Sequence, residues 1–253
     1  MDPVDTSVLD HPLLSRRYFF PRREPLPGAF NVPVPGATLA CWLHAPHPQA
    51  PLLVHFHGNG EIVADYLGPP VDAFSALGLN LLLAEYRGYG ASTGAPLLGA
   101  MLDDVEPLLR ALPANPARMI LFGRSVGSIF AIRGAALFPE LAGLILESGI
   151  AAPLERFLLR VYPDELGVTR RELEAAVAAR MDHQAALAAF HHPTLVLHAR
   201  HDSLVPVENG LRLHAWAGGP RRLVVFDNGD HNSIMACNWK EYLDEVGRFV
   251  RGL

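Results

Sequence analysis

Short apolar runs recur along the chain and alternate with longer segments that have an apolar residue every three or four positions. The clearest runs are 52–56, 80–85, 119–122, 144–147, 193–198 and 222–226. Runs of this length without polar alternation are typical of strands that are buried on both faces of a parallel sheet. They therefore predict an α/β fold in which helices cover both faces of the sheet.

The segments between the runs have helical spacing. Leu98, Met101, Leu102, Val105 and Leu108 recur at offsets of three and four residues, near the helical period of 3.6, within a helix predicted over 97–112. Further helices are predicted up to Leu77, after the Ser125 region, and over 206–216 and 233–250. Near the N-terminus, 29–34 and 38–44 read as strands. Pro33 and Pro35 favour an edge hairpin there, because proline cannot donate a ladder hydrogen bond.

The rhythm of strand and helix stops after Ser148. Residues 151–190 contain no strand-like run and instead predict two amphipathic helices, which we interpret as a short helical cap inserted at about 150–190. Residues 1–27 are rich in Pro and Arg and predict an arm over the surface. The expected organisation is an arm over 1–27 and one α/β domain over 28–253.

Composition narrows the class of protein. Half of the 253 residues are hydrophobic and the formal net charge is −5, which argues against a general nucleic-acid binder. Every apolar run is interrupted before it could span a bilayer, and the N-terminus lacks the apolar core of a signal peptide. We therefore expect a cytoplasmic protein, by default and not from a positive signal. Cys41 and Cys237 predict two buried free thiols rather than a disulfide framework. The sequence does not indicate the oligomeric state.

The candidate chemistry begins at Gly123-Arg124-Ser125-Val126-Gly127, a G-x-S-x-G motif between a predicted strand and a predicted helix. In that context the tight turn presents the serine hydroxyl as a nucleophile. Gly90 to Gly94 also matches the motif, with Ser92 at its centre. Ser92 stands several residues beyond its strand and is followed by Pro96, so we interpret it as part of a flexible loop. Ser125 is therefore the predicted nucleophile.

A serine nucleophile needs a histidine base, and the histidine needs a carboxylate. Asp202 follows the run 193–198 and His231 follows the run 222–226, which gives the order Ser, acid, His. Asp227 and Asp230 are less suitable acids because they share a loop with His231. His198 and His201 resemble metal-ligand spacing, but a metal site would need a third ligand, and no metal or other cofactor is expected.

Residues 57–60, His-Gly-Asn-Gly, follow the run 52–56. A loop at this place supplies one backbone N–H of an oxyanion hole, and the residue after the nucleophile supplies the other. We predict that Asn59 and Val126 are these two residues. His57 is expected to brace the loop and Glu61 to cap the following helix.

With Ser125, Asp202, His231 and the His57-Gly58 loop in order, the chain resembles the α/β-hydrolase superfamily. Within it, the segments His57-Gly-Asn-Gly, Glu85-Tyr-Arg-Gly-Tyr-Gly-Ala-Ser, Phe122-Gly-Arg-Ser and Tyr18-Phe-Phe-Pro-Arg-Arg resemble the Bem46-like group, also called ABHD13/ABHD17-type serine hydrolases. The likeness covers roughly residues 16–250 and departs in the cap. It implies an α/β-hydrolase fold with a mostly parallel sheet of the eight-stranded type.

The sequence thus predicts a serine hydrolase that cleaves a small-molecule carboxylic ester or thioester through an acyl-enzyme. An aminopeptidase or amidase with the same triad, a cofactor-free perhydrolase or peroxidase-like activity, and a non-catalytic binding module on the same fold are the alternatives. Asp-nucleophile hydrolases are excluded because the motif carries serine, and a phosphate-binding loop is excluded because it lacks Lys-Ser/Thr. The apolar cap residues Leu154, Phe157, Leu158 and Val161 either line an acyl pocket or pack the cap onto the body.

Overall fold

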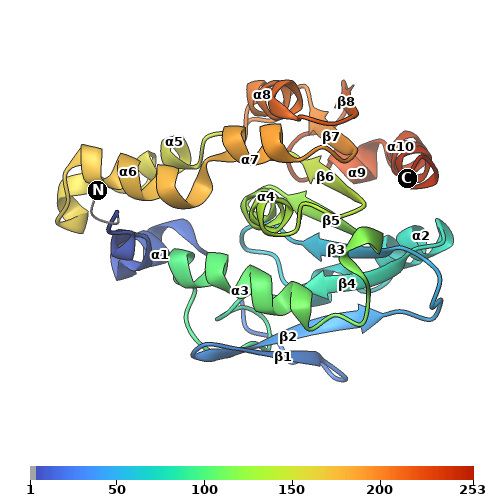
Figure 1. The fold of residues 1–253 in the computed structure, drawn as a ribbon, viewed down its shortest axis with the longest axis horizontal. Coiled ribbons are helices and arrows are strands. Elements are labelled where there is room, and N and C mark those ends of the chain that lie inside the picture. Colours follow the sequence, from blue (N-terminus) through green and yellow to red (C-terminus); the bar gives the residue numbers. More distant parts are fainter. Residues whose placement is uncertain (1–3) are drawn as a thin grey trace.

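The apolar runs pair into a single eight-stranded sheet, seen in the computed structural model, which describes residues 4–253 (Figure 1). Residues 1–3, which belong to the expected arm and to the N-terminus expected to lack a signal peptide, lie outside the described residues. The strands are β1 (Phe30–Val34), β2 (Ala37–His44), β3 (Leu52–Phe56), β4 (Asn80–Ala84), β5 (Met119–Arg124), β6 (Gly143–Glu147), β7 (Thr194–Ala199) and β8 (Arg221–Phe226). Their order is β1-β2-β4-β3-β5-β6-β7-β8. Only the β1–β2 and β2–β4 pairs are antiparallel, which confirms the predicted mostly parallel sheet.

Helices cover both faces of this sheet (Figure 1). They are η1 (Ser7–Asp10), α1 (Pro12–Tyr18), η2 (Val63–Tyr66), α2 (Pro69–Ala76), α3 (Leu98–Arg110), η3 (Pro116–Arg118), α4 (Gly127–Leu137), α5 (Pro153–Leu158), η4 (Pro163–Leu166), α6 (Arg170–Met181), α7 (His183–Ala189), α8 (Glu208–Trp216), α9 (Ile234–Cys237) and α10 (Trp239–Arg251). The helices predicted up to Leu77 and over 233–250 are each broken into two. At the second break, Asn238 Nδ2 donates to the carbonyl oxygens of Asn228 and Ile234.

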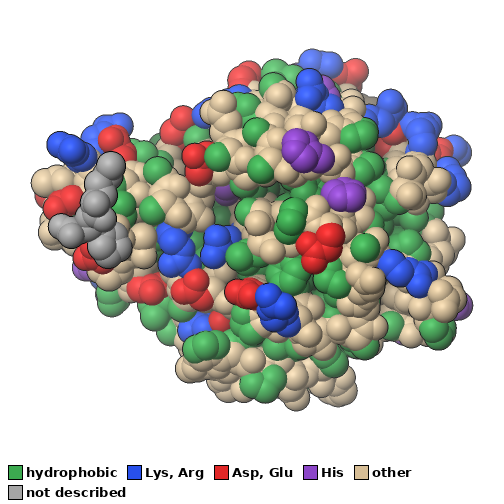
Figure 2. Space-filling model, viewed as in Figure 1, with side chains coloured by type: hydrophobic (Ala, Val, Ile, Leu, Met, Phe, Trp, Pro, Cys, Tyr) green, Lys and Arg blue, Asp and Glu red, His purple; other side chains and the backbone are tan. Residues whose placement is uncertain are grey.

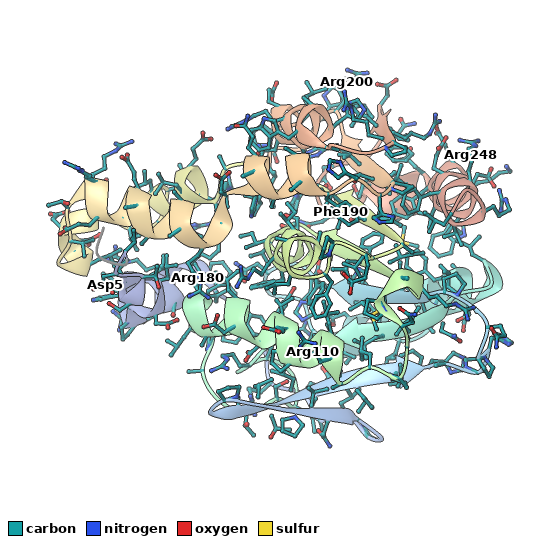
Figure 3. The ribbon with its side chains drawn as sticks, viewed as in Figure 1. Asp5, Arg110, Arg180, Phe190, Arg200 and Arg248 are labelled. Carbon is teal, nitrogen blue, oxygen red and sulfur yellow. The ribbon has the colours of Figure 1, made fainter. Side chains whose placement is uncertain are left out.

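Two apolar cores lie on opposite sides of the sheet, and successive residues of each central strand contribute to one or the other. Val54 of β3 packs in the core beneath α3 and α4, whereas Leu53 packs in the core beneath α2 and α10. This is the period of two that a strand imposes on its side chains. Side chains fill the space between the sheet and the helices on both sides (Figure 3).

The N-terminal segment is not the surface arm that its Pro and Arg content suggested. Leu9 and Leu14 are fully buried and Phe19 nearly so, in the same core as α3 and α4. Arg17 of α1 forms a two-pronged ion pair with Glu165 of η4, at 2.7 and 2.9 Å. Figure 1 shows this segment in blue beside the yellow α5 and α6. The few apolar side chains of this segment therefore determine where it packs, although its Pro and Arg content predicted a position on the surface.

Two smaller expectations are also corrected. Cys41 is a buried free thiol as predicted, but Cys237 on α9 is exposed. Ser92 is fully buried, and its Oγ accepts a hydrogen bond from the Ala40 N–H at 2.9 Å. It therefore belongs to a fixed turn that joins β2 to the loop after β4, and the flexible loop that we predicted there is wrong.

None of the helices within residues 4–253 combines the length and the apolar character needed to cross a bilayer. On the face shown in Figure 2, acidic and basic side chains are interspersed.

Candidate active site

Ser125 lies at the turn between β5 and α4. Its φ of +52° is in the left-handed region, which a non-glycine residue adopts only where its surroundings hold it. The Ser125 N–H donates to the Glu147 carbonyl oxygen at 2.8 Å, and Ser128 Oγ donates to the Ser125 carbonyl oxygen at 2.6 Å. A Cβ at Gly127 would overlap the backbone of Phe56, so the motif needs glycine there. The turn thus fixes Ser125 at the carboxyl end of the strand.

The structure brings Ser125, His231 and Asp202 together from three loops. Ser125 Oγ lies 2.9 Å from His231 Nε2, and His231 Nδ1 lies 2.7 Å from Asp202 Oδ2. All three side chains are buried. The loops follow β5, β7 and β8, so the meeting point is the carboxyl edge of the parallel sheet. This arrangement lets a serine hydroxyl pass its proton to a histidine that a carboxylate orients.

The two rival acids are occupied elsewhere. Asp227 forms an exposed ion pair with Arg200 at 2.5 Å. Asp230 Oδ1 accepts from Ser233 Oγ at 2.7 Å and so closes a turn of the loop. Of the three carboxylates considered, Asp202 is the one hydrogen-bonded to His231.

Asp202 is held in its ionised form. Burial opposes ionisation, but hydrogen bonds from His198, His231 and the Val205 amide outweigh it and keep the Asp202 pKa well below its usual range. The Leu204 and Val205 N–H groups donate to Oδ1 at 3.0 and 2.7 Å. His198 Nε2 lies 2.8 Å from the Val205 carbonyl oxygen and 3.5 Å from Asp202 Oδ2. The histidine that resembled a metal ligand therefore supports the carboxylate loop.

Asn59 and Val126, the predicted oxyanion-hole residues, both line the hollow that contains Ser125. Within residues 4–253, neither the Asn59 N–H nor the Val126 N–H donates a hydrogen bond. His57 Nε2 lies 2.7 Å from Glu85 Oε1, and Tyr86 Oη donates to the His57 carbonyl oxygen at 2.7 Å. His57 thus anchors the loop that carries Asn59.

Glu61 has a different role from the helix cap predicted for it. Its carboxylate accepts from the Gly58 N–H at 2.6 Å and pairs with Arg124. Arg124 also contacts Glu147 at 3.1 Å and donates through Nη2 to the His231 carbonyl oxygen at 3.0 Å. The variable residue of the G-x-S-x-G motif therefore links the serine turn to the histidine loop. Sequence reasoning missed this role, although a charged residue directly after a buried strand is a signal.

The Asn59 side chain holds the N-terminal segment over the hollow. Its Nδ2 donates to the Tyr18 carbonyl oxygen, and its Oδ1 accepts from the Phe20 N–H and from Tyr89 Oη, each at 3.0 Å. Tyr18 and Phe20 both line the hollow as a result. Sequence reasoning did not foresee a wall built from the N-terminal segment.

The hollow around Ser125 has a volume of about 210 Å³. Its lining residues are Tyr18, Phe20, Asn59, Arg124, Ser125, Val126, Ile150, Arg156, Arg160, Leu204, Val205, His231 and Asn232. The predicted substrate-binding residues of the cap are absent from it. Phe157 and Val161 are buried in the core, and Leu154 and Leu158 pack partly buried against it. The apolar stripe of this segment therefore faces the body, and the acyl-pocket prediction is wrong for these four residues.

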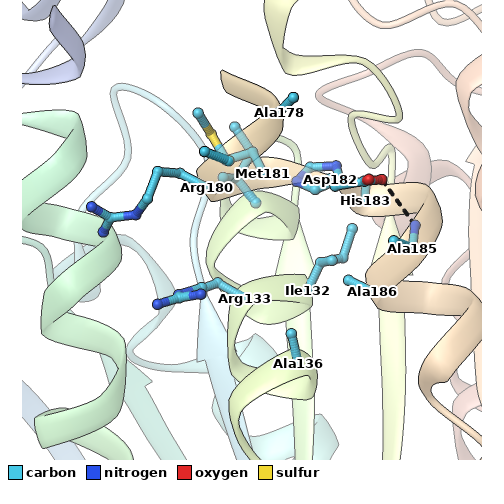
Figure 4. A pocket seen from close by; sticks show the side chains of 12 residues that line it. Ile132, Arg133, Ala136, Ala178, Arg180, Met181, Asp182, His183, Ala185 and Ala186 are labelled. Carbon is cyan, nitrogen blue, oxygen red and sulfur yellow. Dashed lines mark hydrogen bonds between the residues drawn. The ribbon is translucent and has the colours of Figure 1, made fainter. Parts of the chain in front are cut away.

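A second hollow, of about 270 Å³, lies between α4 and the α6–α7 pair (Figure 4). It contains Arg133, Arg180 and His183 but none of the residues grouped around Ser125. Arg180 extends from α6 toward α3, where it pairs with Asp103 (Figure 3). His183 is buried with Nδ1 2.9 Å from the Ile150 carbonyl oxygen. We therefore treat the Ser125 hollow as the candidate active site.

The chain is similar to several known proteins. The model of a family described as serine aminopeptidase, S33, matches residues 47–164. An uncharacterized protein of Mycobacterium tuberculosis is 29% identical over 93% of this chain and 86% of its own length. Human alpha/beta hydrolase domain-containing protein 17B is 26% identical over 85% of this chain and 72% of its own length.

Solved structures share the fold. An esterase of Pyrococcus furiosus superposes with a TM-score of 0.69 at 16% identity, over 93% of this chain and 97% of its own. An esterase of Exiguobacterium antarcticum gives 0.65 at 19% identity, over 88% and 99%. The predicted fold is confirmed, and the family model, the relatives and the shared fold together support the predicted resemblance to the α/β-hydrolase superfamily. Within the superfamily it resembles the ABHD17-type proteins.

Proposed function

We propose that the protein is a serine hydrolase that cleaves a carboxylic ester or thioester through an acyl-enzyme. The observation that carries the proposal is the hydrogen-bonded chain from Ser125 Oγ through His231 to the Asp202 carboxylate, at 2.9 and 2.7 Å. Those distances are in the range that proton transfer requires. The esterases among the structural neighbours share the fold alone.

In the proposed reaction, Ser125 Oγ attacks the substrate carbonyl carbon while His231 Nε2 takes the hydroxyl proton. The carbonyl oxygen becomes an oxyanion that accepts hydrogen bonds from the Asn59 and Val126 N–H groups, each contributing about 3 kcal/mol to the transition state. His231 then gives its proton to the departing oxygen or sulfur. Asp202 stabilises the imidazolium throughout.

Water completes the cycle. His231 takes a proton from water, the resulting hydroxide attacks the acyl-enzyme, and the second tetrahedral intermediate collapses. The carboxylic acid leaves and Ser125 regains its proton from His231. Because protonated His231 cannot act as the base, the rate is expected to fall toward acid pH.

Replacing the nucleophile tests the proposal. We expect Ser125→Ala to lower kcat toward p-nitrophenyl esters by on the order of 10³ or more. Ser92→Ala is the matched control, because it changes the serine of the second motif, which lies in a structural turn. Full esterase activity in the Ser125→Ala protein would refute the assignment.

An aminopeptidase or amidase is the second candidate, favoured by the description of the matching family model. The same residues cleave amides by the same steps, so the reaction must be separated by substrate. Aminoacyl anilides and p-nitrophenyl esters, compared by kcat/KM, distinguish the two activities. A fluorophosphonate probe separates both from a binding module, since only an activated Ser125 forms the covalent adduct.

A further inference from the structure

Two arginines from the cap segment line the hollow that contains Ser125. Arg156 belongs to α5, and Arg160 lies in the turn that follows this helix. No aspartate or glutamate lines the hollow. Within residues 4–253, neither guanidinium forms an ion pair.

Two carboxylates near these arginines in the sequence pair with other cations, and Asp164, which forms no ion pair among the described residues, does not line the hollow. Glu155 contacts Arg212 of α8 at 3.4 Å, and Glu165 binds Arg17 of α1 at 2.7 Å. The third arginine of the hollow, Arg124, is already paired with two glutamates. Arg156 and Arg160 are therefore the arginines that line the hollow without an ion pair among the described residues.

The backbone that carries the two arginines is fixed in place. Phe157, between them, packs edge-on against Tyr18 with ring centroids 4.8 Å apart. Arg17 donates to the Arg160 carbonyl oxygen at 3.2 Å, and the Arg160 guanidinium lies 5.8 Å from the Phe20 ring centroid. Such anchoring lowers the entropy that the segment loses when a ligand binds.

Part of the rim is apolar. Phe20 and Leu204 are 48% and 50% exposed, large values for such side chains, and both line the hollow. Ile150 and Val205 add buried apolar surface. A ligand that matches this lining has an apolar part together with one anionic group close to the reacting carbonyl.

We propose that Arg156 and Arg160 form an anion subsite, so that the substrate is an ester or thioester carrying a carboxylate or phosphate near the scissile bond. Guanidinium groups suit both anions because their planar donors match paired oxygens. The inference rests on the proposed function, since it names the substrate class of the same site. Arg156 and Arg160 would set specificity without taking part in bond cleavage.

Matched substrates test the subsite. The first pair is p-nitrophenyl hydrogen adipate and p-nitrophenyl methyl adipate, which differ only in the charge at the acyl end. The second is 3-carboxyphenyl butyrate and its methyl ester, which place the charge on the alcohol side. We expect the wild type to favour the anionic member of at least one pair by tenfold or more in kcat/KM.

The double variant Arg156→Gln/Arg160→Gln should reduce that ratio by tenfold or more, mainly through the KM of the anionic ester. Arg156→Lys/Arg160→Lys should retain a larger share of it because the charge remains. Arg212→Gln is the matched control: it removes an arginine near α5 that does not line the hollow, and the ratio should stay unchanged. Equal kcat/KM for both members of both pairs would overturn the proposal.

A binding measurement separates this proposal from the proposed function. Benzoate and phenyl phosphate are titrated into the Ser125→Ala protein by NMR, which requires no hydrolysis and distinguishes carboxylate from phosphate. Binding that is lost in Ser125→Ala/Arg156→Gln/Arg160→Gln supports the subsite even if no ester is cleaved. Absence of binding of both anions, beside an active wild-type esterase, would reject the subsite and leave the hydrolase intact.

Discussion

At the scale of the residue, Arg124 connects the turn that carries Ser125 to the loop that carries His231. It donates to the His231 carbonyl oxygen and pairs with Glu61 and Glu147 while remaining only 11% exposed. Glu147 is buried, and Tyr242 Oη donates to it as well. Removing one member of such a group leaves the other charges buried without compensation.

Arg124→Leu should therefore affect both stability and rate. We expect the free energy of unfolding to fall by about 3–5 kcal/mol, because Glu147 loses its cation. Urea denaturation measures this loss. In Arg124→Lys, which keeps the charge but not the fork of donors, kcat toward an ester should fall with a smaller loss of stability. Arg110→Ala is the control, because it removes an exposed i,i+4 ion pair with Glu106. It should change the free energy of unfolding by less than about 0.5 kcal/mol. A stable, fully active Arg124→Leu protein would contradict the linking role.

The approach of Ser125, His231 and Asp202 was predictable, because each residue directly follows an apolar run and parallel strands end at one edge. Arg124, the Asn59 side chain and Arg156 were not. Their roles depend on contacts with segments far away in the sequence. One example is the contact between Arg124 and His231, which are 107 positions apart. No local pattern specifies such a contact, whereas a strand followed by a G-x-S-x-G turn is local.

At the scale of the element, α1 and α5 hold each other beside the hollow. Tyr18 packs against Phe157, and Arg17 pairs with Glu165. The Asn59 side chain fastens the end of α1 to the loop after β3. The N-terminal segment is thus a structural part of the candidate site.

Asn59→Ala should release this segment while keeping the backbone N–H. The loss of three hydrogen bonds is expected to lower the free energy of unfolding by about 1–3 kcal/mol. Native-state trypsin cleavage after Arg17 or Arg22 should become faster, which mass spectrometry can follow. Asn115→Ala loses one exposed cap at η3 and serves as control. Unchanged cleavage in Asn59→Ala would show that the side chain does not fasten the segment.

Strands were more predictable than helices here. All eight lie within two residues of their expected positions, because an apolar run ends where its strand ends. The break between α9 and α10 was missed, since it depends on Asn238 reaching the loop carbonyl of Asn228. The N-terminal helices were missed because Arg and Pro surround their few buried apolar residues.

At the scale of the whole molecule, two buried histidines, His55 and His183, are held in their neutral form. Burial lowers the pKa of His183 to about 4, partly offset by its bond to the Ile150 carbonyl oxygen. Burial likewise lowers the His55 pKa well below its usual range. In the unfolded chain both would take up a proton near pH 6.5. The unfolded state therefore binds more protons between pH 6.5 and 4, and stability is lost as the pH falls through that window.

Acid denaturation should show this effect. For His183 alone, the loss between pH 6.5 and 4 is about 3 kcal/mol. His183→Asn, whose amide can still donate to the Ile150 carbonyl, should flatten the dependence of unfolding free energy on pH by up to one proton. His214→Asn, at a partly exposed position with a weaker lowering of its pKa, is the control. An identical pH slope in wild type and His183→Asn would contradict the prediction.

The packing of the N-terminal segment constrains the order in which parts of the chain can fold. Leu9, Leu14 and Phe19 leave the ribosome first, yet they share a core with Phe157 and Leu173, which are made some 150 residues later. During that interval these side chains can pack against α3 and α4 but lack the part of their core that the cap supplies. The N-terminal segment of the nascent chain therefore stays only partly covered until the cap emerges. This segment is where a chaperone would bind and where synthesis that stalls early would lead to aggregation.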